Sequence, residues 1–298
     1  MIMKASRTWG HAPKTNGFTL IELVVVIATV GVLAMLLLPA LASTHPDSQV
    51  FQCLNNQRQI ILGWQMYAED NSDLLPPNDY PFASAYATAA NKNQLKNWVV
   101  GTMTSVFDAT AKSELVDTNS LLSPYVTNSF VYHCPADNIS ISGHNNVRSY
   151  SMNSAVGTIW NGYFASGITL GSPVQGGWLS GSSFNANQTT WMTYGKMSSF
   201  TRPSPANTWV IIDENPNTIN DGSFASSALA TSGNTYLIDY ASGLHGGAGG
   251  LAFADGHSII HKWQDRRTYN PPLGMGSTKQ TPDNPDCLYL APLTSAPR

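Results

Sequence analysis

The chain has little charge of either sign. Lys, Arg, Asp and Glu together make up 11% of its 298 residues, well below the roughly 25% that is usual in soluble domains. The formal net charge is −3 and no run of basic residues occurs, so the electrostatic footprint that nucleic-acid binding requires is missing. We therefore expect no nucleic acid among the partners. Hydrophobic residues make up 42%, which is enough for a packed globular domain.

Recognisable catalytic motifs are also missing. The sequence has no G-x-S-x-G nucleophile turn, no H-E-x-x-H helix, no Walker A loop and no dinucleotide-binding fingerprint. The glycines from Gly246 to Gly250 have the wrong spacing for that fingerprint and follow no βαβ pattern. We therefore expect a structural protein and not an enzyme.

Cysteine is rare, and its three copies, Cys53, Cys134 and Cys287, form no C-x-x-C pair. A zinc ribbon and a thioredoxin-like site are therefore excluded. Two alternatives remain. Cys53 and Cys134 form a disulfide if the domain lies outside the cytoplasm, or all three cysteines are small buried apolar residues.

One long hydrophobic run dominates the N-terminal region. Residues 1–17 hold three basic residues and no acid, and residues 18–38, FTLIELVVVIATVGVLAMLLL, carry a single charge, Glu22. An α-helix of this length spans about 30 Å, the thickness of a bilayer core. The sequence thus predicts a leader peptide over 1–17 and a transmembrane helix over 18–38. The basic residues predict a cytoplasmic N-terminus and an ectodomain on the other side.

The segment GFTLIELVVVIATVGVLAMLLLPAL resembles the N-terminal signal of type IV prepilins and type II secretion pseudopilins. The resemblance implies that a prepilin peptidase, which is also the methyltransferase, cuts between Gly17 and Phe18 and methylates the new N-terminus. It implies that Glu22 pairs with the N-terminus of a neighbouring subunit, and Pro39 stands where the family has a proline. The alternative is a secretory signal cut after Ala42, whose hydrophobic core would be shorter and uncharged.

A second helical pattern follows Pro39. The polar segment 43–49 contains Pro46, which interrupts a regular helix. Helical spacing of apolar residues resumes at Val50 and continues until turn residues and Pro76-Pro77 end it. We expect a stem helix over 39–70, bent between Pro39 and Pro46, and a globular ectodomain over 71–298.

Several further segments resemble a pseudopilin subfamily that carries a C-terminal processing-associated H-x9-DG motif. They are CLNNQRQIILGWQMYAEDN, SPYVTNSFVYHCPAD, RSYSMN, VIIDENPNTINDG and LHGGAGGLAFADGHSIIHKW, in which His245 precedes Asp255-Gly256 by the spacing that names the motif. The resemblance implies a pilin-like α+β fold, with the long N-terminal helix packed on a small antiparallel β-sheet. It also implies a structural subunit that assembles with other pilin or pseudopilin subunits. The product would be a type II secretion pseudopilus or a type IV pilus-like filament at the inner membrane.

The residue pattern itself predicts some elements of that sheet. Residues 208–212, TWVII, form a β-branched run typical of a strand, and 244–263 hold a D-G turn between two strand-like runs, which predicts a hairpin. Residues 154–200, rich in Gly, Ser and Asn, predict a loop-rich insertion.

The aromatic residues of this insertion support a second hypothesis. If Trp160, Trp178 and Trp191 are exposed, their rings could stack on sugars, and the chain would be a membrane-anchored module that binds glycans or other polymers. Burial of the same rings would make them ordinary core residues.

Two groups of polar residues are candidate metal ligands. Hard oxygen ligands crowd the segment after 208–212 and would suit Ca²⁺, which major pseudopilins commonly bind in a C-terminal loop; the alternative is a set of Asx turns. These residues are Asp213, Glu214, Asn217, Asn220 and Asp221.

The H-x9-DG segment offers the other group. His245, His257 and His261 with Asp255 could bind zinc. The favoured alternative is a hydrogen bond from His245 to the Asp255-Gly256 turn, which would hold the hairpin together.

Overall fold

The computed structural model describes residues 19–42, 44–78, 96–103, 115–116, 120–141, 143–159, 171–271 and 278–298. The chain divides into two compact units, Met1–Asp47 and Ser48–Arg298. The expected cleavage site at Gly17 and Phe18 lies outside the described residues.

Helix α1, Leu20–Ala42, begins with a capping box. The backbone N–H and the hydroxyl of Thr19 both donate to Oε2 of Glu22, at 2.8 and 2.7 Å, and the N–H of Glu22 lies 3.3 Å from the Thr19 hydroxyl. This reciprocal pair satisfies backbone donors that have no partner within the helix. A local T-x-x-E pattern therefore accounts for the start of α1.

The predicted transmembrane helix is wrong, and with it the single-pass inner-membrane placement. No helix in the described part of the chain is both long and apolar enough to cross a membrane.

The expected long stem helix, bent between Pro39 and Pro46, is also wrong, because the described residues form two helices, and the second, α2, is Thr44–Asp70. Pro46 has no N–H with which to continue the hydrogen bonds of α1, but it is compatible with the first turn of a new helix. Helix α2 buries a face at helical spacing and exposes Leu62 and Met66 opposite it. The buried residues of this face include Cys53, Ile60, Ile61, Trp64 and Ala68.

The main sheet has five strands in the order β5-β3-β4-β7-β8. Their bounds are β3 Tyr150–Asn153, β4 Trp209–Asp213, β5 Ser223–Phe224, β7 Ala248–Phe253 and β8 Ser258–Lys262. The expected purely antiparallel sheet is wrong, because β5 pairs with β3 in parallel while the other pairs are antiparallel. Strands β7 and β8 form a hairpin where the sequence predicts one, and Gly256 has a φ of 99° in its turn.

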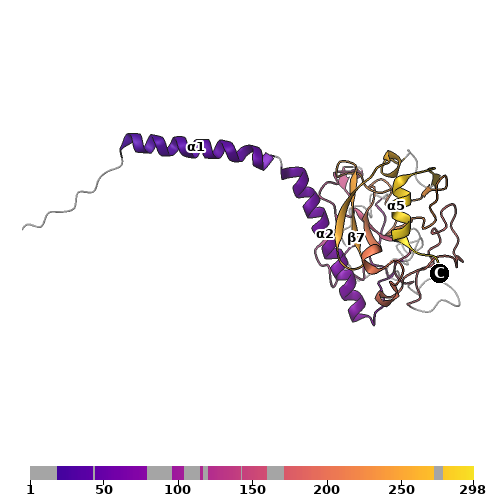
Figure 1. The fold of residues 1–298 in the computed structure, drawn as a ribbon. Helices are drawn as coiled ribbons and strands as arrows, with labels where there is room; N and C mark the ends of the chain where they lie inside the picture. Colours follow the sequence, from indigo (N-terminus) through magenta and orange to yellow (C-terminus); the bar gives the residue numbers. More distant parts are fainter. Residues whose placement is uncertain are drawn as a thin grey trace, which may run out of the picture. The chain divides into compact units, whose positions relative to one another are not determined.

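Helices cover both faces of this sheet, with α2 on one side of β7 and α5, Pro285–Thr294, on the other (Figure 1). A β-bulge between Trp209 and Ile211 shifts the register of β4 against β7. As a result Val210 and Ile211 belong to the core under α2, and Trp209 and Ile212 to the core beside α5. Because both faces are covered, the central strands are apolar without alternation.

Short elements complete the described fold. They are β1 Ser140–Ile141, β2 His144–Asn145, β6 Tyr236–Leu237, β9 Lys279–Gln280, and the 3-10 turns η3 Ser129–Tyr132, η4 Met197–Ser199, η5 Pro205–Asn207 and η6 Arg266–Thr268. The described part of 154–200 consists of turns, single bridges and η4. It nevertheless supplies buried core residues, including Ala155, Leu179, Tyr194 and Phe200.

Candidate functional site

Four side chains from separate parts of the chain meet between α2 and the sheet. Cys53 comes from the middle of α2, Cys134 follows η3, Asp213 ends β4, and His245 lies in the turn before β7. Their ligand atoms all lie within 4.8 Å of one another. The structure therefore holds a cluster that could bind a metal ion.

Three of the distances between ligand atoms in the cluster match those of a coordination shell. The Cys53 thiol donates to Asp213, with Sγ 3.3 Å from Oδ2, and Sγ of Cys134 lies 3.3 Å from Nε2 of His245. The same Nε2 lies 3.8 Å from Oδ2 of Asp213. In a tetrahedral zinc site, with bonds of about 2.0–2.3 Å, neighbouring ligand atoms are about 3.3–3.8 Å apart.

The cluster is shielded from water, and this changes the protonation of its members. Both thiols are buried, and the side chains of His245 and Asp213 are 2% and 1% exposed. Burial raises the pKa of Asp213 to about 7, even though the N–H of Gly250 donates to its Oδ2 at 2.8 Å. The hydrogen bond with Cys134, burial and the charge of Asp213 raise the pKa of Cys53 well above its ordinary value. Burial also lowers the pKa of His245, so it favours the neutral forms of Asp213, Cys53 and His245.

Gly250 lets α2 approach the sheet closely at this point. A Cβ on Gly250 would lie 2.4 Å from Nε2 of Gln57, one helical turn beyond Cys53. No side chain fits in that space without movement of α2 or of the Gln57 amide. Because Gly250 of β7 has no side chain, α2 can lie close to the sheet, and this helps to bring Cys53 to Asp213.

The sequence analysis predicted that only two of these four residues would lie in contact. Cys53 and Cys134 are together, as predicted, but as free thiols and not as a disulfide. Cys287 is also free and lies apart from them, with its Sγ 3.5 Å from the carbonyl oxygen of Tyr236. Sequence reasoning placed Asp213 and His245 in other sites and missed their convergence on the two thiols.

The five predicted calcium ligands do not form one site. Asp213 faces the thiols, whereas Glu214 and Asp221 lie near Arg148 and Asp239. Asn217 is exposed and its amide donates to Oδ1 of Asn215. Within the described residues, the cluster around Asp213 is the only convergence of three or more His, Cys, Asp or Glu ligand atoms.

A buried arginine accompanies the second group of acids. Arg148 is fully buried and donates at 3.0 Å to the carbonyl oxygens of Tyr150, Gly101 and Asp221. Burial raises the pKa of Asp221 to about 7. Burial and neighbouring acids raise the pKa of Glu214 and of Asp239 well above their ordinary values.

The expected contacts of the H-x9-DG segment are wrong. His245 lies in the cluster, and Asp255 instead pairs with His257, whose Nδ1 lies 2.6 Å from Oδ1 of Asp255. The ring of His261 stacks on Tyr289, with ring centres 3.9 Å apart. The three histidines and Asp255 therefore form no zinc site, and Asp255-Gly256 forms the turn of the hairpin.

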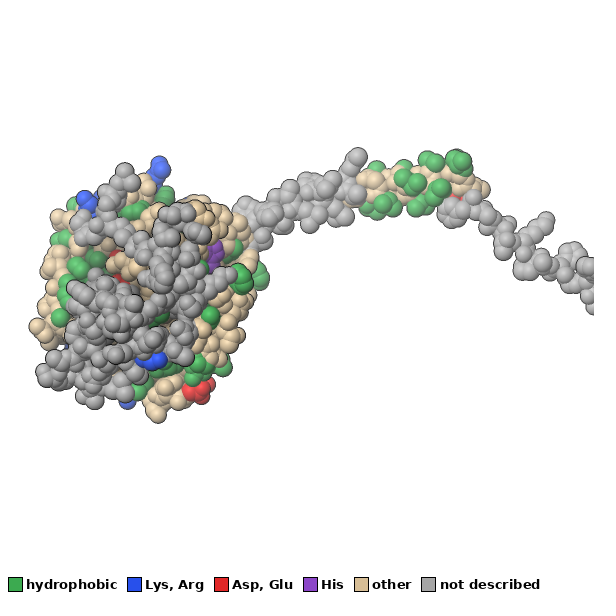
Figure 2. Space-filling model, turned by 180° about the vertical axis from the view of Figure 1, so that it is seen from behind, with side chains coloured by type: hydrophobic (Ala, Val, Ile, Leu, Met, Phe, Trp, Pro, Cys, Tyr) green, Lys and Arg blue, Asp and Glu red, His purple; other side chains and the backbone are tan. Residues whose placement is uncertain are grey.

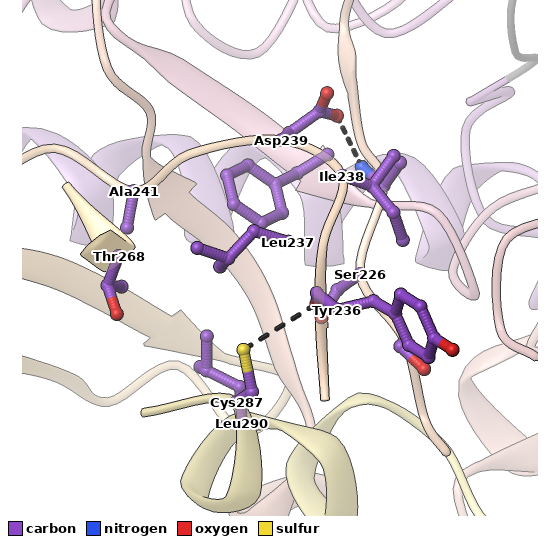
Figure 3. A pocket seen from close by; sticks show the side chains of 12 residues that line it. Ser226, Tyr236, Leu237, Ile238, Asp239, Ala241, Thr268, Cys287 and Leu290 are labelled. Atoms are coloured by element: carbon purple, nitrogen blue, oxygen red, sulfur yellow. Dashed lines mark hydrogen bonds between the residues drawn. The ribbon is translucent and has the colours of Figure 1, made fainter. Parts of the chain in front are cut away.

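The two tryptophans of the glycan-binding hypothesis that lie in the described residues are not exposed. Trp178 and Trp191 are half-buried, and Trp178 packs edge-on against Phe184; Trp160 lies outside the described residues. A small pocket lies between β6 and α5. Among its lining residues, Asp239 accepts from the N–H of Ala225, and the thiol of Cys287 donates to the carbonyl oxygen of Tyr236 (Figure 3). The pocket has room for about one or two water molecules, which is too little for a sugar.

No protein-family model, curated protein or solved structure matches the chain. These comparisons therefore give no support to the expected assignment to the pseudopilins or to a type II secretion system.

Proposed function

We propose that the chain is a prepilin-like structural subunit, cleaved after Gly17 by a prepilin peptidase and assembled with other copies into a pilus-like filament. The observation that carries the proposal is the apolar surface of α1. Leu20, Ile21, Ile27 and Leu33 are 81%, 72%, 63% and 60% exposed. Figure 2 shows hydrophobic side chains along the visible face of the described part of this helix.

An apolar surface of this kind requires a partner. Burial of apolar area contributes about 25 cal/mol for each Å² removed from water, and large exposed apolar patches are typical of interaction sites. The apolar side chains of α1 lie on all sides of the helix. A bundle of identical helices in a filament core would cover such a surface on every side.

Glu22 supports the same function. Both bonds from Thr19 go to Oε2 of Glu22, so Oε1 can accept from a second donor. Cleavage after Gly17 would create an α-amino group at Phe18, four residues before Glu22. We propose that this amino group pairs with Glu22 of a neighbouring subunit, in line with the resemblance to prepilins.

The intact mass of the protein isolated from cells that produce it tests the processing step. We expect the loss of residues 1–17 and the gain of one methyl group. A chain that begins after Ala42 would contradict the proposal.

Two variants at Glu22 separate charge pairing from helix capping. Glu22→Gln keeps an acceptor for the capping box but removes the charge, whereas Glu22→Ala removes both. We expect normal cleavage of both variants and loss of both from the sedimented filament fraction. Normal incorporation of Glu22→Gln would show that Glu22 only caps α1.

A further inference from the structure

We propose that Cys53, Cys134, Asp213 and His245 form a structural zinc site. All four ligand atoms lie within 4.8 Å of one another, and three of the distances between them, 3.3, 3.3 and 3.8 Å, suit tetrahedral coordination. The site is independent of the proposed filament role, because no residue of α1 takes part in it.

The ligand chemistry selects the metal. Ca²⁺ and Mg²⁺ bind through oxygen atoms, and Ca²⁺ takes six to eight of them, whereas this cluster offers two sulfur atoms and one imidazole nitrogen. Zinc combines cysteine sulfur, histidine nitrogen and carboxylate oxygen in four-coordinate sites. The chemistry of this cluster therefore fits zinc and not calcium.

The site is closed, which indicates a structural role. All four positions are filled by protein ligands and both thiols are buried, so no position is left for a reacting water or substrate. Zinc would link α2 to the end of β4 and to the loops that carry Cys134 and His245. Because these segments meet only in the folded chain, binding energy becomes folding energy.

The surroundings can hold the charge of the loaded site. On binding, each thiol releases its proton to solvent, as does the carboxyl group of Asp213 in the chains in which it is protonated. Zn²⁺ with two thiolates and one carboxylate then leaves a net charge of −1. The N–H of Gly250 donates to Asp213 at 2.8 Å, and the hydroxyl of Tyr150 donates to Sγ of Cys53 at 3.5 Å. Donors around metal ligands stabilise their anionic forms.

A disulfide between Cys53 and Cys134 explains the cluster less well. Such a bond would account for the two sulfur atoms alone, whereas a carboxylate and an imidazole also converge on them. The free thiols lie against these groups at the spacing of ligands.

Metal titration of the full chain, reduced and stripped of metal with a chelator, tests the site. We expect one Zn²⁺ bound per chain, with an increase in the midpoint of thermal unfolding of more than about 5 °C. Co²⁺ should give the visible bands of a tetrahedral ion and a thiolate charge-transfer band, both removed by Zn²⁺. X-ray absorption of the zinc-loaded wild type should show two sulfur and two nitrogen or oxygen neighbours, a measurement that needs no variant to fold.

Variants with matched chemistry complete the test. Cys53→Ser and Cys134→Ser should each weaken zinc binding more than about 100-fold. Loss of a residue that only hydrogen-bonds to a ligand lowers metal affinity about 10- to 100-fold, and loss of a ligand itself should lower it further. Cys287→Ser is the control, since it removes a buried thiol outside the cluster, and its zinc affinity should equal that of the wild type. The proposal is overturned if wild-type binding is no tighter than that of the two ligand variants. It is equally overturned if the chain isolated without reductant holds a Cys53–Cys134 disulfide and the reduced chain binds no zinc.

Discussion

Asp213 and Glu214 are adjacent acids at the end of β4, yet they lie in opposite surroundings. Asp213 meets two thiols, an imidazole and a backbone N–H. Glu214 is grouped with Asp221, Asp239 and the guanidinium of Arg148. Successive residues of a strand point to opposite faces of the sheet, so neighbours in sequence have different neighbours in space.

The comparison teaches that similar acids can have different roles in one fold. Both carboxyl groups are fully buried, and burial raises the pKa of each. The side of Asp213 lacks a fixed cation and offers soft ligands, which suits a metal ion. The side of Glu214 has its cation in Arg148, which also holds three backbone carbonyls.

Removal of the Arg148 guanidinium should have the largest effect on the free energy of unfolding. Arg148→Met would leave the buried acids without a counter-charge and three carbonyl oxygens without their donor. We expect a loss of about 3–5 kcal/mol in the free energy of unfolding, measured by urea denaturation. Arg58→Met, at an exposed position of α2, should change it by less than about 0.5 kcal/mol. Equal effects of the two substitutions would remove the contrast between the two sides.

The pH dependence of stability should sharpen the comparison. Asp221 has a pKa of about 7 in the fold against an ordinary value of 3.8. Between these values the folded chain holds a proton that the unfolded chain has released. This contribution to stability is therefore complete below about pH 4 and is lost as the pH rises through 7.

Asp221→Asn should flatten this dependence, because Oδ1 can still accept from the N–H of Ser223 while the charge is gone. We expect the wild type to lose about 2–4 kcal/mol more than the variant between pH 4 and pH 8. The pKa of the exposed Asp283 is lowered by hydrogen bonds from Ser232 and Gly233. The contribution of Asp283 to stability is lost as the pH falls. Asp283→Asn should therefore leave the decline in the free energy of unfolding above pH 4 unchanged. A wild-type stability that does not decline over this range would contradict the assignment.

The smallest effect on the free energy of unfolding is expected from a substitution next to the Asp213 cluster. Tyr150→Phe removes the hydroxyl that donates to Cys53 and leaves the ring in place. Without metal, the free energy of unfolding should fall by no more than about 1 kcal/mol. Zinc affinity should fall about 10-fold, as measured by competition with a chelating dye. An unchanged affinity would show that this hydroxyl does not act on the thiolate.

Local patterns predicted several parts of the fold well. Helical spacing of apolar residues after Val50 predicted a helix there, and α2 buries Ile61, Trp64 and Ala68 from this segment. The D-G turn predicted the β7–β8 hairpin, and the β-branched run predicted β4. These features depend on residues close in sequence, so their physical causes are present in short segments.

The candidate site was only half predicted, because its residues are distant in sequence. Scarcity of cysteine suggested the Cys53–Cys134 pair, but no spacing rule relates either residue to Asp213 or His245. His245 was assigned to the Asp255-Gly256 turn and Asp213 to a calcium loop, since both assignments used neighbours along the chain. The start of α1 was a local feature that could have been found, because Thr19 and Glu22 form the T-x-x-E pattern of a capping box.

The sequence by itself determined the helices and strands whose periodicity and turns are local, and the apolar character of α1. The tertiary structure alone decided which acids meet thiols and which meet Arg148. The physical reason lies in β4, where alternation sends Asp213 and Glu214 to opposite faces of the sheet. Close packing of α2 over Gly250 then brings Cys53 to one of those faces.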